Sequence, residues 1–395
     1  MTPRERRTVG LLSAMYVLRI AGLMLIFPVF SLHAENLSGY SIELMGWALG
    51  GAYGLVQGLL QIPFGIASDR WGRKPVIAAG LLVFAVGSVV AALSTSMWGV
   101  IIGRALQGAG AIAAPVMALL TDLTREEQRT KAMAAIGVTI GGSFIISIIV
   151  GPLVGHALGV SGIFWITAVG SILALVVLLT AVPTPVRITA PTTKRSIEQF
   201  AKTLRDPQLV RLDVGIFVVH MLFSAMFIVL PGILVHFMEL PLAQHWLVYL
   251  PVMLLGVAAM VPALGYSNRD GRARTVFNIA IGVLIVSQIV LALGYRSPLW
   301  LIVGLVIFFT AFNVLEAMLP SLISRLAPPS AKGAAIGVYS TAQFLGIAAG
   351  GALGGPIYKH FGIDALFWFA AASAVVWLLV ALQAAQFKPL ARAAD

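Results

Sequence analysis

The sequence predicts an all-α integral membrane protein with twelve transmembrane helices, and composition is the first reason. Of its 395 residues, 59% are hydrophobic and only 10% are charged, whereas a soluble domain carries about 25% charged residues. The mean hydropathy is +0.97, and one soluble globule of this length has too little interior to bury so many apolar side chains. Because a helix needs about 20 apolar residues to cross a bilayer, the apolar content suits roughly twelve crossings.

Apolar runs separated by short polar segments define the predicted spans. They lie at residues 8–32, 42–68, 75–95, 98–121, 132–155, 161–183, 210–236, 244–267, 274–295, 298–325, 333–356 and 362–387. The first run follows several arginines, as in a secretory signal, but it is too long for a signal segment of about 7 to 15 apolar residues. We therefore expect an uncleaved first helix.

Basic residues gather on one side of the predicted membrane. With the amino terminus inside, the cytoplasmic segments hold 22 of the 26 Lys and Arg residues, and only Arg296 and Lys359 fall outside. The positive-inside rule therefore predicts a multi-pass protein of the cell inner membrane with both termini in the cytoplasm. This placement explains the formal net charge of +11 without a nucleic-acid partner.

The chain divides into two similar halves. Residues 184–209 are rich in Pro, Thr and Lys and predict a cytoplasmic linker between bundles at 1–183 and 210–395. AAIGV recurs at 134–138 and 334–338, and the Gly pair at 151 and 155 recurs at 351 and 355. We interpret this common offset as a duplication into two pseudo-symmetric six-helix bundles, a common construction for secondary transporters.

Several classes of function are disfavoured by absent motifs. The chain has no cysteine, so disulfides, thiolate metal sites and a cysteine nucleophile are excluded. It has no G-x-x-x-x-G-K-[ST] loop for ATP and no H-E-x-x-H or G-x-S-x-G enzyme motif. We predict a protein that is not an enzyme and that has no metal, catalytic residue or cofactor; a membrane-embedded enzyme is the remote alternative.

The most specific segment is GIASDRWGRK at 65–74. Its glycines permit a tight reversal, and its basic residues suit the anionic inner surface of a membrane. The segment resembles the signature loop of the major facilitator superfamily, with Ala67 in place of the usual leucine. The matching residues are Gly65, Asp69, Arg70, Gly72, Arg73 and Lys74.

Two further segments extend the resemblance over essentially the whole chain. RALQGAG at 104–110 resembles the fourth-helix motif, and GPLVG at 151–155 resembles the fifth-helix motif of proton-driven antiporters, with Ser147 and His156 replacing its outermost glycines. The chain resembles the drug:proton antiporter branch, and is most similar to the YajR-type transporters. Those proteins commonly carry an additional carboxy-terminal soluble domain, whereas this chain stops at Asp395, so regulation by that domain is not carried over.

The resemblance implies a conformational latch at the inner face. Asp69 would brace the start of the eleventh helix near Lys332, and Arg73 and Asp122 would complete a charge network. A carboxylate at a helix amino terminus gains about 0.3 to 1 kcal/mol, enough to bias two conformations. The alternative is a turn that serves only topology.

The resemblance also implies that Gly151, Pro152 and Gly155 seal the route between the halves against leak. Proline removes a backbone donor and bends its helix. A bend that serves packing alone is the alternative interpretation.

Four ionisable residues fall within spans, where a charge costs about 2.5 to 3.5 kcal/mol at the membrane centre, and this makes them functional candidates. They are Arg19, Arg104, His220 and Glu316, and in the resembled fold their helices line the central cavity. Gln107 and Asn313 lie one turn from Arg104 and Glu316 on the same helix faces.

Each of the four also has a structural alternative. Arg104 with Gln107 would be a fixed packing network, His220 would be satisfied by a backbone carbonyl, and Glu316 would form a static salt bridge with Arg19. The functional hypothesis is that Glu316 exchanges a proton, with Arg19 as its conditional partner. Weaker lining candidates are Tyr53, Gln57, Gln61, Tyr339 and Gln343.

The predicted function is secondary active transport. The fifth-helix motif favours a proton-coupled antiporter, driven by the proton gradient, that exports small amphipathic or drug-like molecules by alternating access. A proton symporter or an uncoupled facilitator of a small metabolite is the alternative. Because Arg19 stands where relatives carry an acidic first helix, we expect neutral or anionic amphipaths as substrates, and we expect a monomer in the lipid bilayer.

Overall fold

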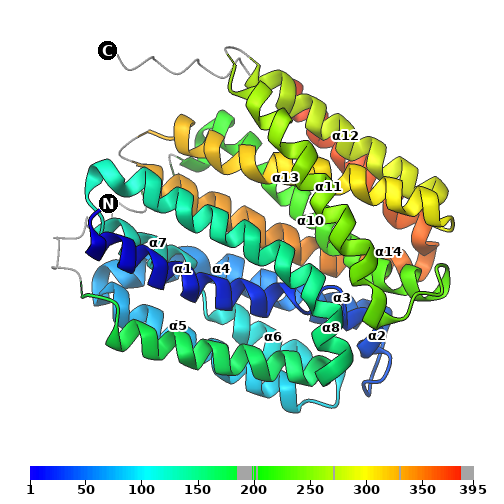
Figure 1. Ribbon diagram of the computed structural model, residues 1–395, viewed down its shortest axis with the longest axis horizontal. Helices are drawn as coiled ribbons and strands as arrows, with labels where there is room; N and C mark the ends of the chain where they lie inside the picture. Colours follow the sequence, from blue (N-terminus) through cyan, green and yellow to red (C-terminus); the bar gives the residue numbers. More distant parts are fainter. Residues whose placement is uncertain (185–197, 199, 202, 270–271, 329–330, 384–395) are drawn as a thin grey trace.

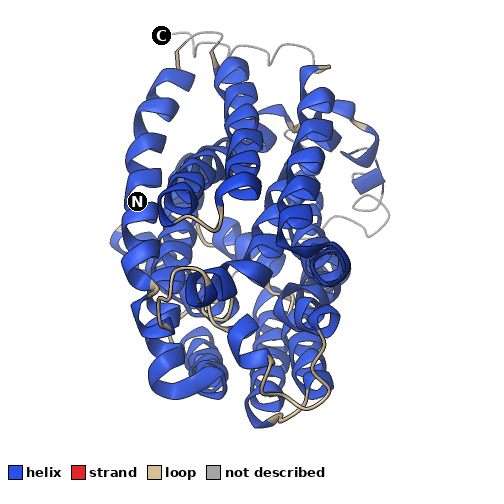
Figure 2. Ribbon diagram, turned by 90° about the vertical axis from the view of Figure 1, so that its right-hand side faces the viewer, coloured by secondary structure: helices blue, strands red, loops and turns tan. Residues whose placement is uncertain are grey.

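The structure is a computed structural model that describes residues 1–184, 198, 200–201, 203–269, 272–328 and 331–383, so most of the predicted linker lies outside the described residues. Helices form nearly all of the described chain, with loops at their ends (Figure 2). The first half contains α1 (Pro3–Met24), α2 (Phe30–Ala34), α3 (Ile42–Gly46), the π-helical turn η1 (Trp47–Gly51), α4 (Ala52–Trp71), α5 (Arg73–Leu93), α6 (Met97–Ala109), α7 (Ala113–Asp122) and α8 (Glu126–Thr180). The second half contains α10 (Pro207–His236), the short 3-10 turn η2 (Leu242–Gln244), α11 (Trp246–Ser267), α12 (Ala273–Gly294), α13 (Pro298–Leu326) and α14 (Lys332–Leu382).

The helices provide twelve crossings, as the sequence predicts. Among the described residues, nine helical stretches are long and apolar enough to cross a membrane. Two of them, α8 and α14, supply two crossings each, because the chain departs from helical geometry at Gly159 (φ 67°) and Gly362 (φ 85°). Positive φ values favour glycine, which has no Cβ to clash. The remaining crossing is the continuous run of α3, η1 and α4.

Local chemistry sets several helix boundaries. The hydroxyls of Ser41 and Ser96 accept hydrogen bonds from the first turns of α3 and α6, which satisfies donors that have no partner within the helix. Gly72 (φ 98°) lies between α4 and α5 and permits the tight reversal predicted from the sequence. The first crossing is interrupted between α1 and α2, where Pro28 lies.

The molecule has two ends that differ in charge. We call the end with the start of α1 and the loop between α4 and α5 the basic face, and the end with Glu43 and Lys359 the opposite face. In Figure 1 the amino terminus lies at the left, the first half (blue to green) occupies the lower part, and the second half (lime to red) occupies the upper right. The helices run between the two faces.

Close contacts between the halves lie toward the opposite face. A Cβ atom at Gly355 of α14 would lie 2.7 Å from the carbonyl oxygen of Ile42 in α3, and one at Gly351 would lie 2.6 Å from the amide nitrogen of Gly51 in η1. Glycine therefore permits this helix crossing. At the start of α14, by contrast, no atom of another described element lies within 4 Å of the Cβ position of Gly333.

Candidate functional site

Glu316 lies in the middle of α13, and its side chain retains 30% exposure. Its Oε1 atom lies 3.4 Å from Nδ1 of His220, a buried residue of α10. The imidazole also contacts the carbonyl oxygen of Ile216 through Nδ1 at 3.2 Å and Nε2 of Gln343 through its own Nε2 at 2.9 Å. Three helices of the second half, α10, α13 and α14, therefore bring one carboxylate, one imidazole and one amide together.

The hydrogen-bond partners assign the state of His220. The amide nitrogen of Gln343 only donates, so Nε2 of His220 is the acceptor, and Nδ1 carries the proton that points to the Ile216 carbonyl. The ring is therefore neutral in this arrangement. A second proton on Nε2 would require the Gln343 amide to turn and present its oxygen.

Arg19 of α1 has its partners in the first half of the chain. Its Nη2 atom donates to Oε1 of Gln57 at 2.5 Å, to the carbonyl oxygen of Gly110 at 3.1 Å and to the hydroxyl of Tyr53 at 3.4 Å, while its buried Nε has no partner among the described residues. The predicted Arg19–Glu316 pair is absent from this conformation, because neutral acceptors of the same half hold the guanidinium. No described carboxylate neutralises Arg19.

Aromatic side chains from both halves meet beside His220. The ring of Phe312 lies 6.0 Å from the imidazole and stacks on Phe144 of α8 at 5.4 Å. Phe223 of α10 contacts Phe144 at 5.2 Å and Phe27 at 5.2 Å. This apolar cluster joins the two halves next to the titratable group.

Arg104 is fully buried, and its hydrogen-bond partners are two backbone carbonyls and a glutamine side chain. Its Nε and Nη2 atoms donate to the carbonyl oxygens of Ala48 and Leu49 at 3.1 and 2.8 Å, and both residues belong to η1. Its Nη1 atom donates to Gln107 at 2.9 Å, and its guanidinium lies 4.8 Å from the ring of Tyr53. Arg104 therefore has the partners of a packing network, because it donates to two buried carbonyls of the π-helical turn, and its role in proton coupling stays a prediction.

Part of the predicted latch is formed at the basic face. Arg73, the first residue of α5, pairs with Asp69 near the end of α4 and donates from Nε to Oδ2 of Asp122 at 3.0 Å. Its Nη1 atom also donates to the hydroxyl of Ser68 at 2.8 Å. Among the described residues Asp69 has no ion pair with the second half, so the three predicted charges form a network within the first half alone.

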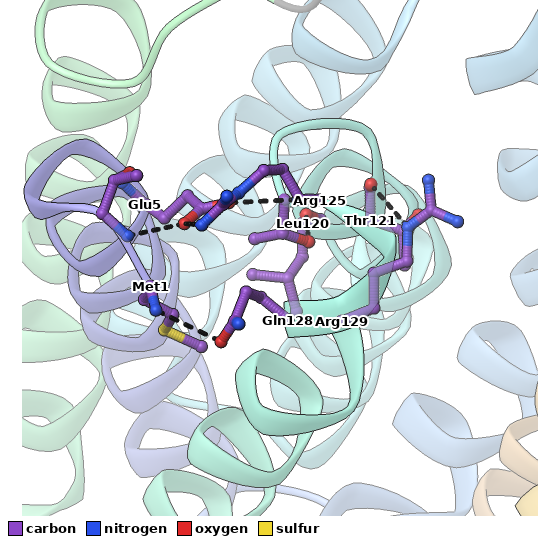
Figure 3. Close-up of polar contacts among 9 residues, drawn as sticks. Met1, Glu5, Leu120, Thr121, Arg125, Gln128 and Arg129 are labelled. Carbon is purple, nitrogen blue, oxygen red and sulfur yellow. Dashed lines mark hydrogen bonds and ion pairs between the residues drawn. The ribbon is translucent and has the colours of Figure 1, made fainter.

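The amino terminus is tied to the start of α8 beside this network (Figure 3). The carboxylate of Glu5 accepts from the backbone nitrogen and Nε of Arg125 at 3.1 and 3.0 Å, and the terminal amine of Met1 donates to Oε1 of Gln128 at 3.2 Å. Thr2 and Glu5 also form a capping box at the start of α1. These contacts fix the segment that follows Asp122.

The glycines of the predicted antiporter motif are packed against the break in the first crossing. A Cβ atom at Gly151 would lie 2.7 Å from the carbonyl oxygen of Leu25, and one at Gly155 would lie 2.5 Å from Cγ1 of Val29. Pro152 lies within α8 between them. This packing is present; a seal between the halves stays a prediction.

Comparisons with known proteins agree with this architecture. The family model for the Major Facilitator Superfamily matches residues 12–351 and 212–392. The chain belongs to the major facilitator superfamily. It is 46% identical to the Inner membrane transport protein YajR of Escherichia coli K12 over 383 residues, which cover 96% of this chain and 84% of that protein.

Two more distant superfamily proteins are also similar. The Multidrug resistance protein MdtH of Yersinia enterocolitica is 28% identical and is matched over 86% of this chain and 82% of its own length. The crystal structure of a bacterial homolog to the human lysosomal transporter Spinster has a TM-score of 0.73 at 14% identity, covering 97% of this chain and 96% of that chain. The superfamily fold and an inner-membrane transporter are therefore established for this chain.

Sequence reasoning missed two charged groups of this superfamily member. Lys359 donates to Oε1 of Glu43 at 2.5 Å and thereby joins α14 to α3 across the two halves at the opposite face. Asp213 of α10 is a buried carboxylate, so Glu316 is not the only carboxylate within the spans. The signals were present: Lys359 is one of two basic residues predicted outside, and Asp213 falls just inside a predicted span.

We expect Asp69→Asn to leave the fold intact and to weaken closure of the basic face. The change removes one carboxylate near the surface and leaves the Arg73–Asp122 contact in place. Because the chain has no native cysteine, single cysteines at Arg70 and Gly333 can be labelled with a maleimide. Both should react faster in the Asp69→Asn variant, and equal rates would support the turn that serves only topology.

Proposed function

We propose that this chain is a proton-coupled antiporter that exports small amphipathic molecules from the cytoplasm by alternating access. The basic face would be cytoplasmic, with both termini and the linker 184–209 between bundles 1–183 and 210–395 on that side. The proton gradient would supply the driving force. Reporter fusions that place either terminus outside the cell would overturn this orientation.

One observation carries the proposal, namely the partly exposed Glu316 beside the buried His220. A titratable carboxylate in the middle of a membrane helix is costly, and an uncoupled facilitator has no need of it. Glu316 can hold either a proton or the polar group of a substrate. Competition between these two occupants produces antiport, because each must leave before the other binds.

The distribution of close contacts supports alternating access. The opposite face is closed by the glycine crossing of α14 on α3 and η1 and by the Lys359–Glu43 ion pair. At the basic face, Gly333 has open space around it and Asp69 has no partner in the second half among the described residues. We interpret this conformation as inward-facing. A second, outward-facing conformation would break the glycine crossing and let Asp69 reach α14.

The charges of the site favour a neutral amphipathic substrate. Arg19 is a buried cation without a described anionic partner, and it disfavours a strongly cationic ligand. Glu316 disfavours an anion whenever its own proton has left. A neutral molecule is repelled by neither charge, and it can donate a hydrogen bond to Glu316 and pack on the aromatic cluster. The similarity to a protein named for multidrug resistance supports a substrate of this kind.

The uncompensated Arg19 gives one specific reason to test symport as well. An anionic substrate could bind beside Arg19 while Glu316 holds a proton, and the two would then move together. The neutral dye N-phenylnaphthylamine and its anionic analogue anilinonaphthalene sulfonate separate the two mechanisms in proteoliposomes that contain a pH indicator.

An antiporter should move protons opposite to the neutral dye, whereas a symporter should move protons with the anionic dye. Dye flux without any proton flux would identify a facilitator. Either of these last two results would overturn the antiport proposal.

A further inference from the structure

A row of four glycines, spaced four residues apart, forms the first-half side of the crossing with α14. A Cβ atom at any of them would lie 3.0 Å or less from an atom of α14, so the whole row packs against that one helix. The row begins in α3, passes through η1 and ends in α4. This glycine row consists of Gly46, Gly50, Gly54 and Gly58.

The spacing of the glycine row does not suit a continuous α-helix. With 3.6 residues per turn, residues four apart differ by about 40° around the helix axis, and three such intervals add up to about 120°. In the π-helical turn η1, the amide of Ala52 donates to the carbonyl of Trp47, five residues earlier. The extra residue in this turn reverses about 100° of the rotation. The π-helical form of η1 therefore keeps the glycine row on one face.

Arg104 of α6 holds η1 from the first-half side. Its Nε and Nη2 atoms donate to the carbonyl oxygens of Ala48 and Leu49 at 3.1 and 2.8 Å, which are neighbouring residues inside the turn. The guanidinium is a rigid planar fork, so it fixes the separation of the two carbonyls that it bridges. Arg104 forms no ion pair in the described part of the chain, so these neutral acceptors determine where its side chain lies.

The base of Arg104 is itself fixed within the first half. Its Nη1 atom donates to Gln107, and Nε2 of Gln107 donates to the hydroxyl of Ser88 in α5 at 2.8 Å. A Cβ atom at Gly87 of α5 would lie 2.6 Å from the carbonyl oxygen of Gly103 in α6, so these two helices are in close contact. Arg104 therefore connects a rigid helix pair of the first half to the turn that faces the second half.

We propose that Arg104 is a positioning residue of the transport cycle, an inference that rests on the proposed alternating access. It holds η1 in the π-helical form and thereby aligns the glycine row with α14 when the opposite face closes. Without Arg104, η1 relaxes to an α-helical turn, and α3 rotates by about 100° relative to α4. Met45 or Trp47 then takes the place of Gly46 at the crossing, and the two halves no longer meet closely.

The test reports how often the crossing opens. Ser224 of α10 is completely buried, and its hydroxyl lies 2.6 Å from the Cβ position of Gly50. Because the chain has no native cysteine, Ser224→Cys provides a single thiol whose reaction with methyl methanethiosulfonate can be timed in lipid nanodiscs. We expect Arg104→Gln to raise the rate of this reaction by about tenfold or more, because two hydrogen bonds from a charged donor are lost. Arg104→Lys should raise it too, since one ammonium group lacks the fork that bridges both carbonyls.

Deletion of Ala48 supplies a rescue that a general loss of folding would not show. In the Arg104→Gln background, the deletion removes the extra residue of η1, so a continuous α-helix then keeps α3 on its present face without any support. The reaction rate of the thiol should return close to the parent value. The matched control is Arg129→Gln, because Arg129 also donates to a backbone carbonyl of the first half, that of Thr121 at 3.2 Å, but lies near the basic face. This variant should react at the parent rate.

The outcomes separate the positioning role from the proposed function. A parent rate in Arg104→Gln, or a raised rate that deletion of Ala48 does not lower, would overturn the positioning role and leave the proposed function standing. In proteoliposomes that transport N-phenylnaphthylamine, the parent thiol should react faster than at rest, because the crossing opens in each cycle. A thiol that never reacts while the dye is transported would overturn alternating access and, with it, the proposed function.

Discussion

Gly46→Ala should shift the protein from the inward-facing conformation toward one with an open opposite face. A Cβ atom at Gly46 would overlap the carbonyl oxygen of Gly351, which belongs to the backbone of α14 and has no rotamer to change. Overpacking at such a site costs about 1 to 3 kcal/mol, and about 1.4 kcal/mol corresponds to a tenfold change in a two-state ratio. We therefore expect the ratio of molecules with a closed opposite face to those with an open one to fall by about tenfold.

The natural absence of cysteine makes this shift measurable. Cysteines introduced at Glu43 and Lys359, whose side chains are in contact, should be joined efficiently by a short bismaleimide in the parent background. Adding Gly46→Ala should lower the yield of this cross-link. The matched control is Gly282→Ala in α12, where no atom of another described helix lies within 4 Å of the added Cβ position. An unchanged yield in Gly46→Ala would mean that the glycine crossing does not hold the opposite face closed.

The helices could be predicted from the sequence because membrane spans depend on composition over about 20 residues. All twelve predicted spans correspond to observed crossings, and the returns at Gly159 and Gly362 fall at or near their predicted limits. The partners of each charged residue within the site are harder to predict from the sequence, because several polar residues on facing helices could bind the same charge. Arg19 is bound by Tyr53 and Gln57 rather than by Glu316. From the sequence alone, these two residues are only weaker candidates for lining the cavity.

Arg104 illustrates a second limit. Its main partners are the carbonyls of Ala48 and Leu49, and every residue carries a carbonyl that looks the same in sequence. These two are selected by the packing of α6 against the π-helical turn η1, and no motif in the sequence predicted that turn. Asp213 shows a third limit: a carboxylate close to a predicted helix end suggests an exposed position, whereas the packing of α10 against α14 buries it.

Glu316→Gln should abolish transport driven by a pH gradient while it preserves binding and exchange of the substrate. Glutamine keeps the size of the side chain and the contact with His220, and it removes the only proton that Glu316 can exchange. A carrier that must release a proton before it binds substrate would then lose the coupling of substrate transport to the proton gradient. It could still exchange one substrate molecule for another across the membrane. Accumulation of N-phenylnaphthylamine against its gradient in proteoliposomes should fall to the level of empty liposomes, with counterflow of labelled dye retained.

The matched control is Glu127→Gln, the same chemical change at an exposed position in the first turn of α8, which should transport at the parent rate. The alternative coupling group is the neighbouring imidazole of His220. If Glu316→Gln still concentrates dye as well as the parent, the carboxylate is structural and His220 becomes the coupling group. In that case Gln343→Glu should change the pH dependence of transport. A carboxylate at position 343 would accept a hydrogen bond from Nε2 of His220 and stabilise the charged imidazole. If both variants match the parent, the proton does not pass through this site, since His220–Glu316 is the only ion pair between α10 and α13 among the described residues.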